Sequence, residues 1–230
     1  MVYNKATSVA QRLLPKSQVK LQVLEQIIGK ARGSLPIQKE NKMPRKYMFT
    51  KEEITEAALN ITRRNGFSAL TARSLGQELG CSSKPVFGLF DNMESVQNAV
   101  LGAARKLYNE RIESGMAEGK YPPYKASGMA YIGFAREEKE LFRLLFMRDR
   151  SKEGPPQEDR EELRPLLDLI MKNLGISEDE AFIFHIEMWI YVHGIASMIA
   201  TSYLELDEET VSKMLTDMYV GLTLRYTEKQ

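Results

Sequence analysis

The chain contains, at positions 79–90, the stretch Leu79-Gly80-Cys81-Ser82-Ser83-Lys84-Pro85-Val86-Phe87-Gly88-Leu89-Phe90. A four-residue turn, 80–83, joins helical patterns that lie on both sides of it. A short helix, a glycine-containing turn and a second short helix make a helix-turn-helix, whose second helix sits in the major groove of DNA. The stretch therefore predicts a DNA-binding unit within residues 49–101.

Signals for the start and end of helices surround this turn. Thr50-Lys51-Glu52-Glu53 is a capping box, in which the threonine hydroxyl and the glutamate side chain each bind a free backbone N–H. Gly66 is the predicted end of that helix. Pro85 falls in the first turn of the third helix, where a missing N–H is tolerated. The predicted caps of four successive helices are Thr50, Thr71, Ser82 and Asn92.

Helical patterns also fill the C-terminal half. The predicted helices cover about 125–136, 138–148, 159–174, 178–204 and 207–226. Ser177-Glu178-Asp179-Glu180 is a second capping box, and the helix that it opens is apolar nearly all round. Such a helix needs a partner on each of two faces. No strand pattern competes, so we predict an all-α fold of about nine helices.

The pattern of breaks divides the chain into three parts. Residues 1–42 are an N-terminal extension of unknown status, either natural or a misassigned or added leader. Residues 43–97 are the predicted helix-turn-helix domain, and residues 98–230 the predicted helical body.

Charge is distributed unevenly along the chain. The formal charge is +6 over residues 1–42, +3 over 43–112 and −8 over 113–230, which together give the net +1. A basic N-terminal half and an acidic C-terminal half suit a protein that places one end against a polyanion.

Several classes of protein are disfavoured. The single cysteine, Cys81, excludes an internal disulfide and is interpreted as a buried thiol in a reducing cytosol. The apolar stretch from Met188 is interrupted by His193, Gly194 and Ser197, so we expect no bilayer span, which needs about 20 apolar residues. The N-terminus shows no export signal. We therefore expect a cytoplasmic protein without membrane association.

Enzymatic motifs are equally absent from the sequence. It contains no glycine-rich phosphate loop, no Cys/His metal set and no recognisable nucleophile near a histidine. His185 and His193 are eight residues apart, which does not favour a shared metal. We expect no catalytic activity, no cofactor and no metal site.

Residues 49–101 resemble the DNA-binding domain of the TetR family of transcriptional regulators. The segments that carry the resemblance are Gly66-Phe67, Leu70-Thr71-Ala72-Arg73-Ser74-Leu75, Leu79-Gly80-Cys81-Ser82, Val86-Phe87-Gly88-Leu89-Phe90 and Glu94-Ser95-Val96. In the C-terminal half, Trp189-Ile190-Tyr191-Val192-His193-Gly194 is similar to the Trp…His-Gly signature of one C-terminal domain type in that family.

This resemblance implies a homodimer that pairs through the last two helices of each subunit into a four-helix interface. Two recognition helices would enter successive major grooves of a near-palindromic double-stranded DNA operator. Family members are usually repressors that a small-molecule effector releases from DNA, and the resemblance implies that role here. An activator remains open, because the sequence does not encode where the operator lies.

The predicted DNA-binding residues belong mainly to the third helix and its approach. They are Arg45, Lys46, Thr71, Ser82, Ser83, Lys84, Phe87 and Gly88. Residues at the start of a recognition helix reach base edges and phosphates, and Gly88 lets the backbone come close. Arg63 and Arg64 are interpreted as a solvated face. The family usually has Tyr at position 87 and Lys at position 93, where this chain has Phe87 and Met93, and each departure removes a backbone contact.

The resemblance places an effector pocket among the middle helices of the body. The candidate lining residues are Tyr131, Phe134, Phe142, Phe146, Met147, Trp189 and His193, with Tyr124 also considered. For each single aromatic residue, ordinary core packing is the competing interpretation. Pockets of this composition are mostly hydrophobic, so the predicted effector is apolar or aromatic.

Phe87 and Met93 keep a second function open. The alternative is a helical dimeric module that binds a small molecule or a protein and has weakened operator binding.

Overall fold

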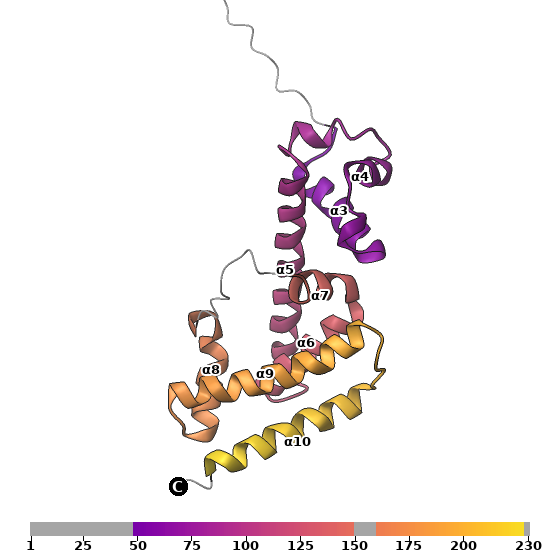
Figure 1. The fold of residues 1–230 in the computed structure, drawn as a ribbon. Coiled ribbons are helices and arrows are strands. Elements are labelled where there is room, and N and C mark those ends of the chain that lie inside the picture. The colour runs from indigo at the N-terminus through magenta and orange to yellow at the C-terminus, as the bar shows by residue number, and fades with distance from the viewer. Residues whose placement is uncertain (1–47, 150–159, 228–230) are drawn as a thin grey trace, which may run out of the picture. The chain divides into compact units, whose positions relative to one another are not determined.

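The computed structural model describes residues 48–149 and 160–227 (Figure 1). Within these ranges the chain forms eight α-helices and two short 3-10 helices, with no strand. The elements are α3 (Lys51–Asn65), η1 (Phe67–Ala69), α4 (Ala72–Glu78), η2 (Val86–Gly88), α5 (Met93–Ala117), α6 (Pro123–Glu137), α7 (Lys139–Phe146), α8 (Arg160–Leu174), α9 (Glu178–Ala200) and α10 (Glu208–Thr227). The all-α prediction is confirmed.

The helix starts follow from local side-chain chemistry. At α3 the Thr50 hydroxyl accepts from the Glu53 N–H at 3.1 Å, and the Glu53 carboxylate accepts from the Thr50 N–H at 2.7 Å. The same reciprocal arrangement opens α4 at Thr71, α5 at Asn92 and α9 at Ser177. Each box satisfies donors that a helix N-terminus otherwise leaves free.

The helix α5 connects the N-terminal helices to the body. Val96, Val100 and Ala104 on α5 are fully buried, and α5 contacts α3 near one end and α6 near the other (Figure 1). On α5, Gly115 allows the close approach of α6, because a Cβ there would meet the Ala130 Cβ at 2.8 Å. One continuous apolar core therefore extends from α3 to α10. The predicted domain boundary at residues 97 and 98 falls inside α5 and stays a prediction.

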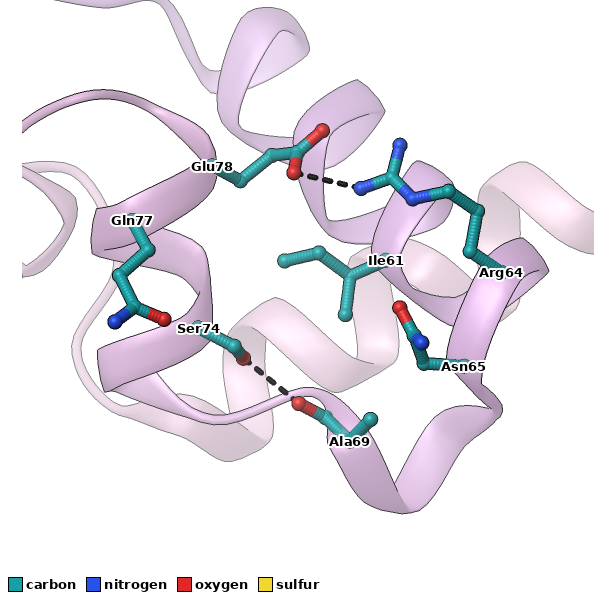
Figure 2. Close-up of a pocket in the computed structure, with 7 residues that line it drawn as sticks. All are labelled: Ile61, Arg64, Asn65, Ala69, Ser74, Gln77 and Glu78. Carbon is teal, nitrogen blue, oxygen red and sulfur yellow. Dashed lines mark hydrogen bonds and ion pairs between the residues drawn. The ribbon is translucent and has the colours of Figure 1, made fainter.

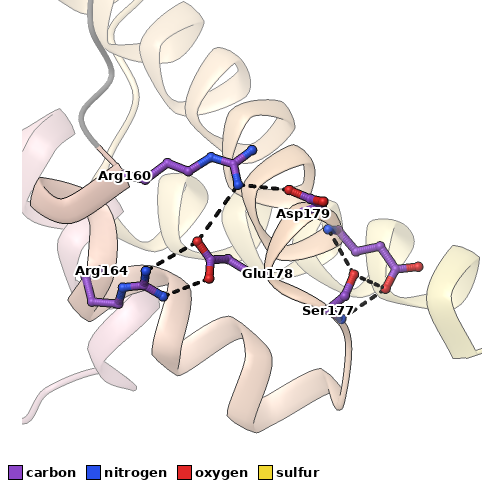
Figure 3. A network of polar contacts seen from close by, with 6 residues as sticks. Arg160, Arg164, Ser177, Glu178 and Asp179 are labelled. Carbon is purple, nitrogen blue, oxygen red and sulfur yellow. Dashed lines mark hydrogen bonds and ion pairs between the residues drawn. The ribbon is translucent and has the colours of Figure 1, made fainter.

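A second, smaller core holds α8 against α9 and α10. It contains Leu167, Ile170, Ala181, Phe184 and Met188. Ion pairs lie beside this core, where α8 meets the first turn of α9 (Figure 3). The two shortest contacts there join Arg164 to Glu178 at 3.0 Å and Arg160 to Asp179 at 2.8 Å. Exposed pairs contribute little individually, so the apolar core carries most of the stability here.

By length and composition alone, α9 is long and apolar enough to cross a membrane. It is a longer apolar helix than the stretch from Met188 suggests. Its contacts with α6, α7, α8 and α10 place it as a central helix of the described body. Helices in that position are apolar on more than one face because they have more than one partner.

Candidate functional site

The first part of the candidate DNA interface is the close contact between α4 and the turn that follows it. The Cys81 N–H donates to the Gly76 carbonyl at 2.9 Å. A Cβ at Gly76 would meet the Cys81 carbonyl oxygen at 2.9 Å and the Ser83 nitrogen at 3.2 Å. Only a residue without a side chain leaves the turn room to fold back onto α4 at this distance.

The third segment differs from the predicted α-helix. Only Val86–Gly88 is regular, and it is a 3-10 helix whose N-cap is Pro85, without a side-chain cap. The Val86 N–H donates to the Ser83 carbonyl at 3.2 Å, and the Gly88 N–H to the Pro85 carbonyl at 3.2 Å. These are i to i+3 bonds, so the tighter helix forms. The proposed cap at Ser82 is wrong, and Pro85, which has no N–H, cannot donate to it.

Most of the predicted DNA-contacting side chains are on the surface. The exposed members are Thr71, Ser82, Lys84, Phe87 and Gly88. Ser83 is half-buried, and Arg45 and Lys46 lie outside the described residues. Val86 and Phe90 are buried and anchor the segment to the core. The exposed residues therefore sit on a segment whose opposite side is fixed by packing.

A polar hollow lies between α3 and α4, which the sequence did not indicate (Figure 2). Its volume is about 380 Å³, and its lining residues are Ile61, Arg64, Asn65, Ala69, Ser74, Gln77 and Glu78. Arg64 and Glu78 form an ion pair of 2.6 Å across it. Ser74 donates to the Ala69 carbonyl at 2.7 Å. These contacts join α3, η1 and α4 into one unit.

Arg63 is not simply solvated, as the sequence suggested. Its guanidinium binds the carboxylate of Glu138, which lies between α6 and α7, with Nη2 to Oε1 at 2.9 Å and Nε to Oε2 at 3.0 Å. From α7, Arg143 donates to the Ala200 carbonyl at the end of α9 at 2.7 Å. Polar contacts thus link α3 to α7 and α7 to α9.

Most of the predicted effector residues meet in one aromatic cluster in the body. Tyr131, Phe134 and Phe142 are buried, and Phe146 is half-buried. The Tyr131 ring contacts the Phe142 ring at 5.5 Å and the Phe146 ring at 5.2 Å between centroids. Rings at such angles and distances attract one another in addition to their burial. The cluster is packed by its own side chains.

A polar pair lies within this cluster. The Tyr131 hydroxyl and His193 Nδ1 are 2.8 Å apart, and the Ser197 hydroxyl lies 3.3 Å from His193 Nε2. Trp189 stacks on the His193 ring, with centroids 5.0 Å apart and planes 17° apart. The Trp…His-Gly segment therefore puts its tryptophan and histidine directly against the cluster.

Burial keeps these groups neutral. Desolvation raises the pKa of the Tyr131 hydroxyl and lowers the pKa of His193. The neutral imidazole offers one donor and one acceptor nitrogen, which suits a hydroxyl on either side. The site therefore offers apolar surface with a small uncharged hydrogen-bonding group.

Two residues that the sequence analysis missed complete the cluster. Tyr108 on α5 contacts the Tyr131, Phe134 and Phe146 rings, and burial raises its pKa to about 12. The Arg105 guanidinium lies over the Phe146 ring at 5.7 Å. In the sequence, Tyr108 and Arg105 do not stand out from an ordinary amphipathic helix. Met147, by contrast, is 41% exposed.

Tyr124 belongs to a separate cluster with the other histidine. Its hydroxyl lies 3.1 Å from His185 Nδ1, and its ring contacts Phe184 and Tyr219. Burial lowers the pKa of His185 to about 4. His185 and His193 therefore each have their own tyrosine partner. Among residues 48–149 and 160–227 no three metal-binding side chains gather in a cluster.

The outward faces of α9 and α10 carry exposed apolar side chains. They include Ile183, Ile190 and Met198 on α9, and Val220 and Leu224 on α10. Arg225 on α10 forms an ion pair with Glu187 on α9 between them. Exposed large apolar residues on two helices that pack against each other are the side chains that a protein contact surface would use.

Comparison with known families gives a match over residues 124–219, which extends from α6 into α10. The matching model is described as a tetracyclin repressor-like C-terminal domain. A comparison with curated proteins found no matching relative. The family match confirms the predicted resemblance for the C-terminal half, and it contains the Trp…His-Gly segment.

Proposed function

We propose that this chain, whose residues 124–219 match the tetracyclin repressor-like C-terminal domain, is a TetR-type ligand-responsive transcription regulator. In this proposal it is a cytoplasmic, non-enzymatic repressor, released from a near-palindromic operator by an apolar or aromatic molecule. The observation that carries the proposal is this family match, on a chain whose residues 71–90 have the expected order of cap, short helix and turn.

The DNA contact is assigned to the exposed side of residues 82–88. Ser82, Ser83 and Lys84 supply donors for base edges and phosphates, and Thr71 supplies a hydroxyl at the N-terminus of α4. Phosphate contacts account for much of the affinity of such proteins. Arg45 and Lys46, which precede the described residues, are assigned to the DNA backbone or minor groove.

The effector site is assigned to the aromatic cluster around Tyr131 and His193. The rings offer apolar contacts, and the neutral histidine offers a hydrogen bond without charge. Because the rings are in contact with one another, the effector enters by displacing side chains. Phe146 is half-buried, whereas Tyr131, Phe134 and Phe142 are buried. A ligand changes DNA affinity only if it binds two dimer geometries differently.

The homodimer contact is assigned to the exposed apolar face of α9 and α10. Ile190 has an exposed fraction of 60%, and Leu224 of 53%. Pairing of the two helices with the same helices of a second copy makes the four-helix interface and covers this face.

Selection from a pool of random duplexes at two salt concentrations tests the proposal. We expect enrichment of a near-palindrome and an affinity that falls steeply with salt. In the Lys84→Ala variant the salt dependence becomes shallower by about one counterion for each half-site. Lys172→Ala, an exposed substitution in the last turn of α8, is the matched control and leaves the salt dependence unchanged.

A second candidate function is a helical dimeric module with weakened operator binding. Phe87 cannot donate to a phosphate, and Met93 packs partly against the core at the start of α5. The double variant Phe87→Tyr and Met93→Lys separates the two functions. A large gain in DNA affinity favours a regulator with weak backbone contacts, whereas absent binding in both proteins favours the module.

A further inference from the structure

Phe87 is an exposed aromatic residue in the middle of η2. Its exposed fraction is 42%, whereas the adjacent Val86 is fully buried. Apolar surface in contact with water is unfavourable, and covering it in a complex gains free energy in proportion to the area removed. The ring therefore presents apolar surface on the segment assigned to DNA.

The chemistry of this side chain limits what it can contact on a duplex. A phosphate oxygen accepts hydrogen bonds, and a phenyl ring has no N–H or O–H to donate. In the major groove the apolar group of a base pair is the C5 methyl of thymine, and phenylalanine is one of the side chains that contact it. The thymine methyl is thus the feature that Phe87 fits.

The neighbours of Phe87 leave this contact open. Lys84 is exposed and lies three residues before Phe87, ahead of the first residue of η2. A cation there suits a phosphate beside the groove. Gly88 is exposed and has no side chain to block the flank of the ring. Val86 and Phe90 are buried in the core and anchor the segment there.

We propose that Phe87 is a specificity-determining residue that reads the methyl group of one thymine in each operator half-site. This inference rests on the proposed DNA-binding function and adds to it the chemistry of one base pair. It also gives the departure from tyrosine at this position a role of its own, in which a phosphate contact is replaced by contact with a base.

The test uses the full chain and the duplex enriched by the random-pool selection. Each thymine is replaced in turn by deoxyuridine, which removes the methyl group and keeps the hydrogen-bonding edge. We expect the wild-type affinity to fall about fourfold for each half-site at one symmetry-related pair of positions, the value of one apolar methyl contact. Phe87→Ala abolishes this difference, and Phe87→Leu, which keeps an apolar side chain, retains part of it.

Three further outcomes decide against the inference. Equal losses for the wild type and Phe87→Ala at every thymine overturn it and leave DNA binding intact. A Phe87→Tyr variant that gains affinity equally for the thymine and deoxyuridine duplexes shows that the position serves a phosphate, which also overturns it. Failure to enrich any duplex overturns the proposed function together with this inference. Thermal unfolding verifies that each variant is folded. If Phe87→Ala does not fold, the comparison between wild type and Phe87→Leu is sufficient.

Discussion

The guanidinium of Arg63 in α3 and the carboxylate of Glu138 between α6 and α7 form a two-point contact, with Nη2 to Oε1 at 2.9 Å and Nε to Oε2 at 3.0 Å. Both side chains are about one quarter to one third exposed, at 30% and 25%. The planar guanidinium suits such a two-point geometry. The contact joins α3, which packs against the segment proposed to bind DNA, to the helices that hold the aromatic cluster.

Glu138→Gln is expected to lower the free energy of unfolding by about 0.5–1.5 kcal/mol, because the amide keeps the shape and loses the charge-assisted bonds. The matched control is Glu137→Gln, since Glu137 pairs with Arg111 at 2.9 Å on a more exposed part of the surface. Urea unfolding of both variants checks the difference. Equal losses would show that the pair contributes no more than an ordinary surface ion pair.

The hydrogen bond between Tyr131 and His193 is expected to couple α6 to α9. Tyr131→Phe leaves the His193 nitrogen without its partner inside the aromatic cluster, so we expect a loss of about 1–2 kcal/mol. A double-mutant cycle with His193→Phe isolates the pair, and the expected coupling is about 1 kcal/mol. Strictly additive losses in that cycle would contradict a direct contact.

Stability is expected to depend on pH through His185. Burial lowers its pKa from 6.5 in a free side chain to about 4 in the folded protein, so the unfolded chain binds the proton more readily. The contribution is therefore fully present above about pH 6.5 and is lost as the pH falls toward about 4. Between about pH 7 and about pH 5 we expect a loss of about 2 kcal/mol. His185→Gln should remove most of this dependence in urea unfolding, and an unchanged pH slope would exclude His185 as its source.

Gly76→Ala is expected to destabilise the proposed DNA-binding unit. The new Cβ would lie 2.9 Å from the Cys81 carbonyl oxygen, which belongs to the backbone and cannot move aside alone. We expect a cost of about 1–3 kcal/mol, although alanine itself favours a helix. Gly102→Ala in α5 is the control, because nothing lies within 4 Å of its added Cβ. It should stabilise by about 0.5–1 kcal/mol, and thermal unfolding compares the two.

Ile190→Glu is expected to convert the proposed dimer to a monomer. The side chain is 60% exposed in one subunit, and a charge placed in a covered apolar interface is not compensated. Met48→Glu, which changes another exposed apolar residue, is the control and should leave the mass unchanged. Sedimentation equilibrium measures both. A variant at Ile190 that keeps the wild-type mass would place the dimer contact elsewhere.

Local sequence signals predicted the helices well. The caps at Thr50, Thr71, Asn92 and Ser177 depend on residues three positions apart, so the pattern contains all the information needed. The segment around Pro85 was the exception. Ser82 has the residue type of a cap, but Pro85 stands three residues later and has no N–H to donate to its side chain, and the segment that forms is the 3-10 helix Val86–Gly88.

The contacts between distant residues could not be read from the pattern. Arg63 and Glu138 are 75 positions apart, and nothing near either residue indicates its partner. Most members of the aromatic cluster were anticipated as a set, because the family resemblance places a pocket among the middle helices of the body. The separation of Tyr124 and Tyr131 into two clusters, each with its own histidine, was not anticipated. Tyr124 contacts His185, whereas Tyr131 contacts His193, and the Tyr108 ring joins the cluster from α5.

The two tyrosine–histidine hydrogen bonds also fix how α6 and α9 can move. Tyr124 pairs with His185 and Tyr131 with His193, so the helices run in the same direction and meet at two points, seven residues apart on one and eight on the other. Sliding one helix past the other by a turn, about 5.4 Å, would break both bonds at once. A displacement that keeps both bonds must carry the two helices together, so α6 and α9 act as one unit in any movement that preserves these contacts.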